Sequence, residues 1–408
     1  MKIAIINMTH KGSTGKIMLQ IADVARNMGH EAKTYSPMLF SRIKKQVPLV
    51  AENHYTWGNK FESAFHYYVG TLLGLNGFFS LWGTNQLIKN IKKFQPDIVH
   101  LHNLHNFNVN LPLLFHYLKK SNVKVVWTLH DCWSFTGHCP HFVIAKCSKW
   151  KEGCYDCPQL RLYPKSMIDT SKLMYGLKKK WFTGIDNMII VTPSVWLADL
   201  VRQSYLREYS VTVINNGINL NVFKPTKNNF REKYGIPENK RILLGVSQGW
   251  SHSKGVDAFV ELAKRLDSGK YQIVLVGTDD KSDNLLPKNI ISIHQTSNQQ
   301  ELVEIYSAAD LFVNPTREET YPTVNMEAIA CGTPVITFNN GGSPEIPDRS
   351  CGSVVECDDI DSLQKEIERI CMQMPYSAEK CIERAKNFDM NDRFKEYVEL
   401  YENCTYST

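Results

Sequence analysis

Apolar residues follow two alternating patterns along the chain. Short aliphatic runs, which are typical of buried strands, alternate with longer stretches whose apolar residues recur every three or four positions, as in amphipathic helices. This alternation predicts an α/β fold in which parallel sheets carry helices on both faces. The predicted strands are Ile3–Asn7, Ala32–Tyr35, Ile98–Leu101, Val123–Leu129, Met188–Thr192, Val211–Ile214, Ile242–Val246, Gln272–Val276, Ile290–His294, Leu311–Asn314 and Pro334–Phe338.

Helical patterns lie between these strands and indicate two domains. The first helix is expected from about Lys16 to Met28, and others from Gly255 to Leu266 and from Gln299 to Ala308. With 408 residues the chain is too long for one ordinary core. The turn-rich stretch 215–225 is the natural linker between two doubly wound, Rossmann-like domains.

Residues 63–88 differ from the rest because they contain no Asp, Glu, Lys or Arg and are rich in Leu and aromatic residues. Their length alone would permit a membrane span. Four glycines and several polar residues inside the run argue against one. A buried pair of helices or a membrane-interface patch is expected instead, and the basic residues Lys89, Lys92 and Lys93 make interfacial contact a hypothesis.

The net charge of +6 is divided unevenly. Residues 1–222 hold 26 Lys and Arg against 12 Asp and Glu, whereas residues 223–408 hold 21 against 29. The basic half is therefore expected to face an anionic partner. Its basic residues are scattered or in short runs without a nucleic-acid motif, so a phospholipid surface or a diphosphate-linked acceptor fits better than nucleic acid.

Residues 319–336 combine two carboxylates with the start of a predicted helix. Pro322 suits the first helical position, and Gly332 suits the left-handed residue that ends a helix. The amides of Thr323 and Val324 would then be unpaired at the positive end of the helix dipole, which favours a phosphate or diphosphate.

The two carboxylates flank this anion site. Glu327 lies one turn after Thr323 on the same helix face and can reach a hydroxyl beside the phosphate. Glu319, on the incoming loop, can reach the group on the phosphate's other side. From the residues alone, an ordinary helix with an acidic first turn fits equally well.

The stretch Glu319-Thr-Tyr-Pro-Thr-Val-Asn-Met-Glu327 resembles the E-x7-E signature of glycosyltransferase family 4, a group of retaining enzymes with the GT-B fold. The resemblance implies that Glu327 binds the ribose of a nucleotide-sugar and that Glu319, taken as catalytic, contacts the transferred sugar. It also implies that the amides of Thr323 and Val324 hold the diphosphate.

The resemblance further implies an architecture, GT-B: α/β, with two Rossmann-like doubly wound parallel-sheet domains facing a cleft. We place an acceptor-binding domain at residues 1–220 and a nucleotide-sugar-binding domain at 221–387. Asn215-Asn-Gly-Ile-Asn resembles the family's interdomain signature. By the same resemblance, the C-terminal helix 388–408 packs back onto the first domain.

Lys254 precedes a predicted helix, and the resemblance implies that it neutralises the leaving diphosphate. The chain departs from the family at two places among the expected donor-binding residues. Tyr321 and Pro322 stand where the family has Phe-Gly, and Gly249 stands where it has an Arg, five residues before Lys254. Three residues are candidates to replace this Arg: His252, Arg241 and Arg317.

Two features of the first half belong to the same expected site. The loop containing Gly12, Ser13 and Gly15 follows the first strand, where open α/β sheets bind ligands, and the resemblance assigns these residues to the donor cleft. His130 ends a predicted strand and therefore points towards the same edge of the sheet. It matches the family's catalytic His that contacts the transferred sugar. The segment Asp97–His105, with three histidines, is interpreted as acceptor-side or structural.

Five of the eleven cysteines fall between residues 132 and 157. Met1–Asn7 opens directly as a strand, so no export signal is expected and disulfides are disfavoured. A structural zinc site is therefore a hypothesis, with free thiols or a redox-labile disulfide as alternatives. The segment 132–160 resembles an insertion in bacterial exopolysaccharide and colanic-acid-type transferases. The four proposed ligands are Cys139, Cys147, Cys154 and Cys157.

Together these features predict a retaining hexosyltransferase that needs no metal or other cofactor for catalysis. The implied donor is a UDP- or GDP-sugar, and the implied acceptor is a lipid-diphosphate-linked glycan of a bacterial surface polysaccharide. The enzyme is expected in the cytoplasm, peripheral at the inner face of the cytoplasmic membrane. The alternatives are another GT-B enzyme, such as a nucleotide-sugar epimerase or a phosphorylase, and a non-catalytic subunit that binds nucleotide-sugar.

Overall fold

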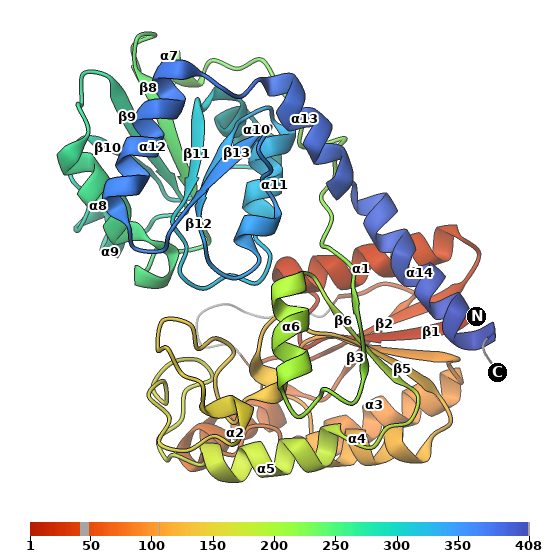
Figure 1. The fold of residues 1–408 in the computed structure, drawn as a ribbon. Helices are drawn as coiled ribbons and strands as arrows, with labels where there is room; N and C mark the ends of the chain where they lie inside the picture. The colour runs from red at the N-terminus through yellow and green to blue at the C-terminus, as the bar shows by residue number, and fades with distance from the viewer. Residues whose placement is uncertain (41–48, 106, 407–408) are drawn as a thin grey trace. The chain divides into compact units, whose positions relative to one another are not determined.

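The computed structural model describes residues 1–40, 49–105 and 107–406. The chain forms two units, one of Met1–Ile214 with Phe394–Thr408 and one of Asn215–Arg393 (Figure 1). The units therefore divide between Ile214 and Asn215, at the start of the predicted linker 215–225 and a few residues before the predicted domain boundary at residues 220 and 221. The last two residues of the predicted segment 388–408 lie outside the described residues.

The first unit is built on a seven-stranded parallel sheet with the order β3-β2-β1-β4-β5-β6-β7. The strand β3 is missing from the sequence prediction because it is a short edge strand whose residues are mostly half-buried, so it carries no aliphatic run. The strands are β1 (Lys2–Ile6), β2 (Glu31–Pro37), β3 (His54–Trp57), β4 (Ile98–Leu101), β5 (Lys124–Thr128), β6 (Met188–Thr192) and β7 (Ser210–Val213).

Helices cover both faces of this sheet, with α1 and α14 on one side and α3, α4 and α5 on the other (Figure 1). The first helix begins at Gly12, four positions before the predicted Lys16, because the Gly-rich loop itself forms its first turn. The helices are α1 (Gly12–Asn27), α2 (Lys60–Leu73), α3 (Leu81–Phe94), α4 (Leu111–Lys120), α5 (Ser171–Phe182), α6 (Val195–Gln203) and α14 (Met390–Tyr406).

The C-terminal part of α14 is attached to the sheet by buried aromatic side chains. The hydroxyl of Tyr401 lies 2.6 Å from His100 Nδ1, and Thr128 Oγ1 donates a hydrogen bond to the hydroxyl of Tyr397 at 3.3 Å. All four side chains are fully buried. Residues that are far apart in the sequence therefore complete one face of the first sheet.

The second unit is built on a six-stranded parallel sheet with the order β10-β9-β8-β11-β12-β13. Its strands are β8 (Arg241–Val246), β9 (Tyr271–Val276), β10 (Ile290–Ile293), β11 (Leu311–Asn314), β12 (Val335–Phe338) and β13 (Gly352–Val355), of which the edge strand β13 was not predicted. Its helices are α7 (Phe230–Lys233), α8 (Val256–Arg265), α9 (Asp280–Asp283), α10 (Gln299–Ala308), α11 (Thr323–Ala330), α12 (Ile360–Gln373) and α13 (Ala378–Ala385).

The charge-free stretch 63–88 forms parts of α2 and α3 with a short turn between them. Among the helices that the structure describes, none combines the length and the apolar character needed to cross a membrane.

The Cys-rich segment packs over a fully buried lysine of α5. Lys178 Nζ donates hydrogen bonds to the carbonyl oxygens of Trp133 and Thr136, and it lies 3.6 Å from the centroid of the Trp133 ring. Burial lowers the pKa of Lys178 to about 7, although Cys154, Cys139 and Asp131 act in the opposite direction. This ammonium group is therefore costly to keep charged inside the first unit.

The low pKa of Lys178 predicts a pH-dependent contribution to stability. The unfolded chain keeps an ordinary lysine pKa of about 10.4, so between the two values only the unfolded state binds the proton. Burial of the charged Lys178 lowers the free energy of unfolding by its full amount below about pH 7, and this loss becomes smaller as the pH rises. Relative to Lys178→Met, the wild-type free energy of unfolding should therefore rise by up to about 1.4 kcal/mol per pH unit above pH 7.

Urea unfolding of the wild type and Lys178→Met across this pH range measures the effect. The adjacent exposed residue provides a matched control, because Lys179→Met should follow the wild-type profile. Parallel pH profiles for the wild type and Lys178→Met would show that the buried amine does not titrate in this range.

Candidate functional site

The second sheet reverses its strand order between β8 and β11, which are hydrogen-bonded neighbours. Loops that leave the carboxyl ends of strands at such a reversal run in opposite directions and leave space for a ligand between them. The loop after β8 carries Lys254, and the loop after β11 carries Glu319. The fold therefore brings two predicted donor-site residues to one edge of the sheet.

The helix that follows Glu319 begins with unpaired amides. Pro322 was predicted to be the first residue of this helix, but it is the residue before the helix. Its ψ of 113° is extended, so the helix begins at Thr323. No side chain caps the helix, and in the described part of the chain the N–H groups of Thr323 and Val324 have no hydrogen-bond partner. After the helix, Gly332 has the predicted left-handed conformation, with a φ of +85°.

Two buried side chains beside this helix start have unpaired polar atoms. Thr320 Oγ1 and Asn325 Nδ2 lack a hydrogen-bond partner among the described residues, and both side chains are more than nine-tenths buried. Asn325 is held through its other amide atom, since Asn314 Nδ2 donates to Asn325 Oδ1 at 2.7 Å. Buried polar groups normally find partners, so these atoms add hydrogen-bonding capacity at the start of α11.

Lys254 and Glu319 form an ion pair, with Nζ 2.5 Å from Oε2. Both side chains are about one third exposed, at 35% and 27%, so the pair is open to a ligand. Its position depends on two glycines with positive φ. A Cβ at Gly341 would lie 1.8 Å from the carbonyl oxygen of Glu319, and one at Gly255 would lie 2.3 Å from that of Pro315.

Glu327 is held from the interior by Tyr306. The fully buried Tyr306 hydroxyl donates to Glu327 Oε2 at 3.0 Å. Burial raises the pKa of Tyr306, and the neighbouring carboxylate raises it further, so the phenol remains a hydrogen-bond donor. Tyr321 is also buried, and burial raises its pKa. The half-buried Glu327 carboxylate is thereby oriented at the far end of the amide site.

The position of the missing family Arg has a backbone that favours glycine. Gly249 has a φ of +98°, and its N–H donates to the carbonyl oxygen of Gly277 at 3.1 Å. An Arg would be strained in this left-handed conformation. The backbone conformation of the loop after β8 at this position therefore suits the glycine that the chain has.

Two of the three candidate replacements are already engaged. Arg317 is buried, binds both carboxylate oxygens of Asp257 at 2.8 Å and donates to Asp358 at 2.5 Å. Arg241 lies at the start of β8, away from the loop that carries Lys254, and pairs with Asp310 at 2.8 Å. His252 is the third candidate; its side chain is 64% exposed and lies 3.3 Å from Asp257.

In the first unit, the Gly-rich loop forms the first turn of α1. Gly12 begins the helix with a φ of +73°, and Ser13 is exposed. A Cβ at Gly15 would lie 2.4 Å from the carbonyl carbon of His10, so this glycine is required by the packing of the loop on itself. The fold of the loop therefore requires glycine at position 15, whether or not Gly15 contacts a ligand.

His130 lies just beyond β5 and forms a pair with His102. Its Nε2 is 2.9 Å from His102 Nδ1, and the two rings are stacked with an interplanar angle of 12°. Burial lowers the pKa of His130 to about 4, and it lowers that of His102 further. Both imidazoles are therefore neutral at physiological pH. His102 comes from the His-rich segment that the sequence analysis interpreted only as acceptor-side or structural.

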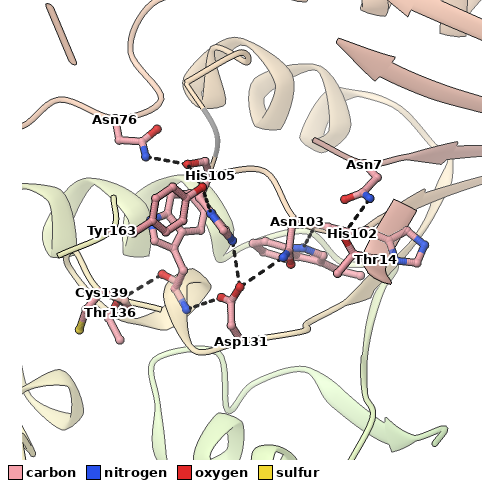
Figure 2. A network of polar contacts seen from close by, with 12 residues as sticks. Asn7, Thr14, Asn76, His102, Asn103, His105, Asp131, Thr136, Cys139 and Tyr163 are labelled. Carbon is pink, nitrogen blue, oxygen red and sulfur yellow. Dashed lines mark hydrogen bonds and ion pairs between the residues drawn. The ribbon is translucent and has the colours of Figure 1, made fainter. Parts of the chain in front are cut away.

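Asp131 forms a second polar cluster beside this pair (Figure 2). Its carboxylate lies 2.9 Å from His105 Nε2 and accepts hydrogen bonds from Asn103 Nδ2 and the backbone N–H of Trp133. Burial by itself would raise the pKa of Asp131, but His105 and the Trp133 N–H hold it at about 2. Sequence reasoning missed Asp131, although its place directly after His130 was a signal for it.

The four predicted zinc ligands line one small space next to Trp150, and they are Cys139, Cys147, Cys154 and Cys157. All four are free thiols. The Gly137 N–H donates to Cys154 Sγ at 3.1 Å, and a hydrogen bond with Cys139 lowers the pKa of Cys157 to about 7. Across the described residues, no group of three or more His, Cys, Asp or Glu side chains is placed to hold a metal ion. The zinc site stays a prediction.

Comparison with solved structures assigns the fold. Sucrose-phosphate synthase from Thermosynechococcus elongatus matches with a TM-score of 0.71 and 17% identity, over 100% of both chains. HepE from Anabaena in complex with UDP matches with a TM-score of 0.66 and 14% identity, over 99% of this chain and 100% of that one. Both similarities support a shared GT-B fold over the whole chain.

Comparison with sequences assigns the family. A protein of Escherichia coli named "Putative colanic acid biosynthesis glycosyl transferase WcaC" is 25% identical over 333 residues, which are 78% of this chain and 80% of the relative. The family model for group 1 glycosyl transferases matches residues 226–388, and that for glycosyltransferase family 4 matches residues 66–222. The chain is therefore a retaining glycosyltransferase of family 4 with the GT-B fold.

Proposed function

We propose that the chain moves a hexose from a UDP- or GDP-sugar to a hydroxyl of a growing bacterial glycan, with retention at the anomeric carbon. The observation that carries this proposal is the start of α11, where unpaired amides lie between the Lys254–Glu319 pair and Glu327. The relative WcaC is named for colanic acid biosynthesis, and HepE was solved with UDP, which supports this class of product and donor.

The diphosphate of the donor would bind the N–H groups of Thr323 and Val324. Both amides lie at the positive end of the α11 dipole, which stabilises an anion. A diphosphate carries more charge than one carboxylate, so it would attract Lys254 away from Glu319. Glu319 would then be released to accept hydrogen bonds from hydroxyls of the sugar.

The ribose would bind Glu327. The carboxylate is oriented by the buried Tyr306 hydroxyl, which occupies Oε2 at 3.0 Å. A carboxylate accepts several hydrogen bonds, so Glu327 can receive the ribose hydroxyls while this contact persists. Because the phenol is buried, the orientation of Glu327 would not depend on solvent or on the donor.

His252 would take the place of the missing Arg. Arg317 is buried in its ion pairs and Arg241 lies at the opposite end of β8, so His252 is the candidate that is exposed near Lys254. Its imidazole would donate a hydrogen bond to the diphosphate in place of the Arg. His252 Nδ1 lies 3.3 Å from Asp257, which holds the ring beside Lys254.

The reaction breaks the bond from the anomeric carbon to the diphosphate and forms one to the acceptor oxygen on the same face. The acceptor's proton passes to the departing phosphate oxygen. The developing negative charge would be stabilised by the α11 amides and Lys254, which are fixed before the reaction begins. His130, by its family resemblance, would contact the transferred sugar as a neutral imidazole held by His102.

The acceptor would be a lipid-diphosphate-linked oligosaccharide at the inner face of the cytoplasmic membrane. The excess of basic residues in 1–222 supports an anionic acceptor for the first unit. A non-catalytic subunit that binds nucleotide-sugar is the second candidate, because the family Arg is replaced by Gly249 in a backbone conformation unfavourable for Arg.

The test is incubation of the purified protein with UDP-, GDP- and ADP-sugars, with and without a polyprenyl-diphosphate glycan. Transfer with retained anomeric configuration, followed by NMR, is the expected result. Inversion at C2 of the donor sugar without transfer would identify an epimerase. Donor binding without turnover on any acceptor would identify the non-catalytic subunit.

The change Glu327→Ala should weaken binding of the nucleotide-sugar by about 1.5–3 kcal/mol, because a charged hydrogen bond to the ribose is lost. Isothermal titration calorimetry measures the change. The control Glu261→Ala removes an exposed carboxylate of α8 that pairs with Arg265, so it should leave the affinity unchanged. An unaltered affinity in Glu327→Ala would remove the ribose role.

The change His130→Ala should lower kcat by roughly 100-fold, as expected when one oriented donor to the transition state is removed. Donor affinity should change much less. Steady-state kinetics with calorimetry separate the two quantities, and His116→Ala on the exposed side of α4 is the matched control. A loss of donor affinity with normal turnover would place His130 outside the sugar site.

A further inference from the structure

The helix α2 exposes its apolar side. Phe61, Phe65, Tyr68 and Leu72 follow the helical repeat and form one stripe, and they are 89%, 57%, 48% and 56% exposed. The opposite side buries Ser63, His66 and Gly70. This arrangement inverts the usual pattern, in which the apolar stripe of a surface helix faces the core.

Specific contacts fix this orientation. The buried His66 bonds through Nδ1 to Ser80 Oγ at 2.8 Å and accepts the Gly77 N–H through Nε2 at 3.1 Å. A Cβ at Gly70 would lie 3.0 Å from the Phe107 ring, so the helix packs closely at this point. Rotating the stripe inward would break both hydrogen bonds, and the exposure of the apolar side is therefore built into the fold.

Two neighbouring segments extend the stripe. Trp82, at the start of α3, is 53% exposed, and its backbone N–H donates to Glu62 Oε1 of α2 at 2.8 Å. Met167 is 48% exposed, and its N–H donates to the carbonyl oxygen of Thr71 at 2.8 Å. We name the combined surface the α2 face, and it consists of Phe61, Phe65, Tyr68, Leu72, Trp82 and Met167.

The α2 face has a cationic border. Lys60 lies on α2, while Lys165 and Lys172 lie on or next to the loop that carries Met167, and all three are exposed. In the described part of the chain no ion pair involves these lysines. The acidic neighbours are occupied by backbone amides: Glu62 binds the N–H groups of Trp82 and Gly83, and Asp169 those of Cys157 and Ser171.

We propose that the α2 face binds the surface of an anionic phospholipid bilayer. Its aromatic and aliphatic side chains would enter the interface between headgroups and acyl chains, and the lysines would contact the phosphates. Trp and Tyr are the residues that favour this depth of a membrane. The proposal specifies how the chain would reach the lipid-linked acceptor of the proposed function, and it depends on that function for its biological role.

A lipid surface accounts for the charge better than a second copy of the chain. A two-fold contact through the α2 face would bring the same lysine border of both copies together, and like charges facing each other at an interface are unfavourable. Lysine is also depleted in protein–protein interfaces. An anionic bilayer instead neutralises every lysine of the border.

The test is co-sedimentation of the full chain with vesicles of phosphatidylcholine, with and without phosphatidylglycerol. The wild type should bind the anionic vesicles at least tenfold more tightly than the neutral ones. The double change Phe61→Ser and Phe65→Ser should reduce this binding at least tenfold, and Lys165→Glu with Lys172→Glu should remove the preference for anionic lipid. The matched control is Leu285→Ser with Met372→Ser, which changes exposed apolar residues of the second unit and should bind like the wild type.

Two outcomes would overturn the proposal. One is equal vesicle binding by the wild type and the Phe61/Phe65 variant. The other is a concentration-dependent dimer, seen by analytical ultracentrifugation, that this variant dissociates, which would assign the α2 face to a second copy. Donor affinity by calorimetry and transfer to a water-soluble acceptor without vesicles should be normal in these variants. If the wild type transfers no sugar to the water-soluble acceptor, the proposed function is contradicted. The vesicle-binding result would still decide whether the α2 face binds membranes.

Discussion

The parallel arrangement of strands is the constraint on which this structure depends. All strands of a parallel sheet deliver their carboxyl ends to one edge, and a reversal of strand order separates two loops at that edge. Both sheets contain such a reversal, between β1 and β4 in the first unit and between β8 and β11 in the second. His102 and the Gly-rich loop follow the first pair of strands, and Lys254 and Glu319 follow the second.

The two cations at the second reversal are paired with carboxylates before any ligand binds. Arg317 is neutralised by Asp257 and Asp358, and Lys254 by Glu319. The two pairs differ in accessibility, because the Arg317 side chain is 7% exposed and that of Lys254 is 35% exposed. Arg317 thus stabilises the loops after β8 and β11, whereas the more exposed Lys254 can exchange its partner for a ligand.

Sequence patterns predicted most of the strands and the short helix that follows Glu319. Aliphatic runs mark the strands, and Pro322 and Gly332 mark the start and end of the helix, so these signals are local. They failed where the signal was not local. The edge strands β3 and β13 lack an aliphatic run, and α1 begins inside the Gly-rich loop. The engagement of Arg317, the pairing of His102 with His130 and the burial of Lys178 all depend on residues distant in the chain, so no window of sequence contained them.

The chain passes from the first unit to the second after Ile214 and returns at Phe394. Tyr397 and Tyr401 cover His100 and Thr128 from positions that are 269 and 301 residues away from their hydrogen-bonding partners. During synthesis from the N-terminus, these tyrosines leave the ribosome after the whole second unit. Until the second unit has been synthesised, the face of the first sheet that carries His100 is therefore not covered by α14. Completion of the first unit therefore depends on prior synthesis of the second, although the two units have separate sheets.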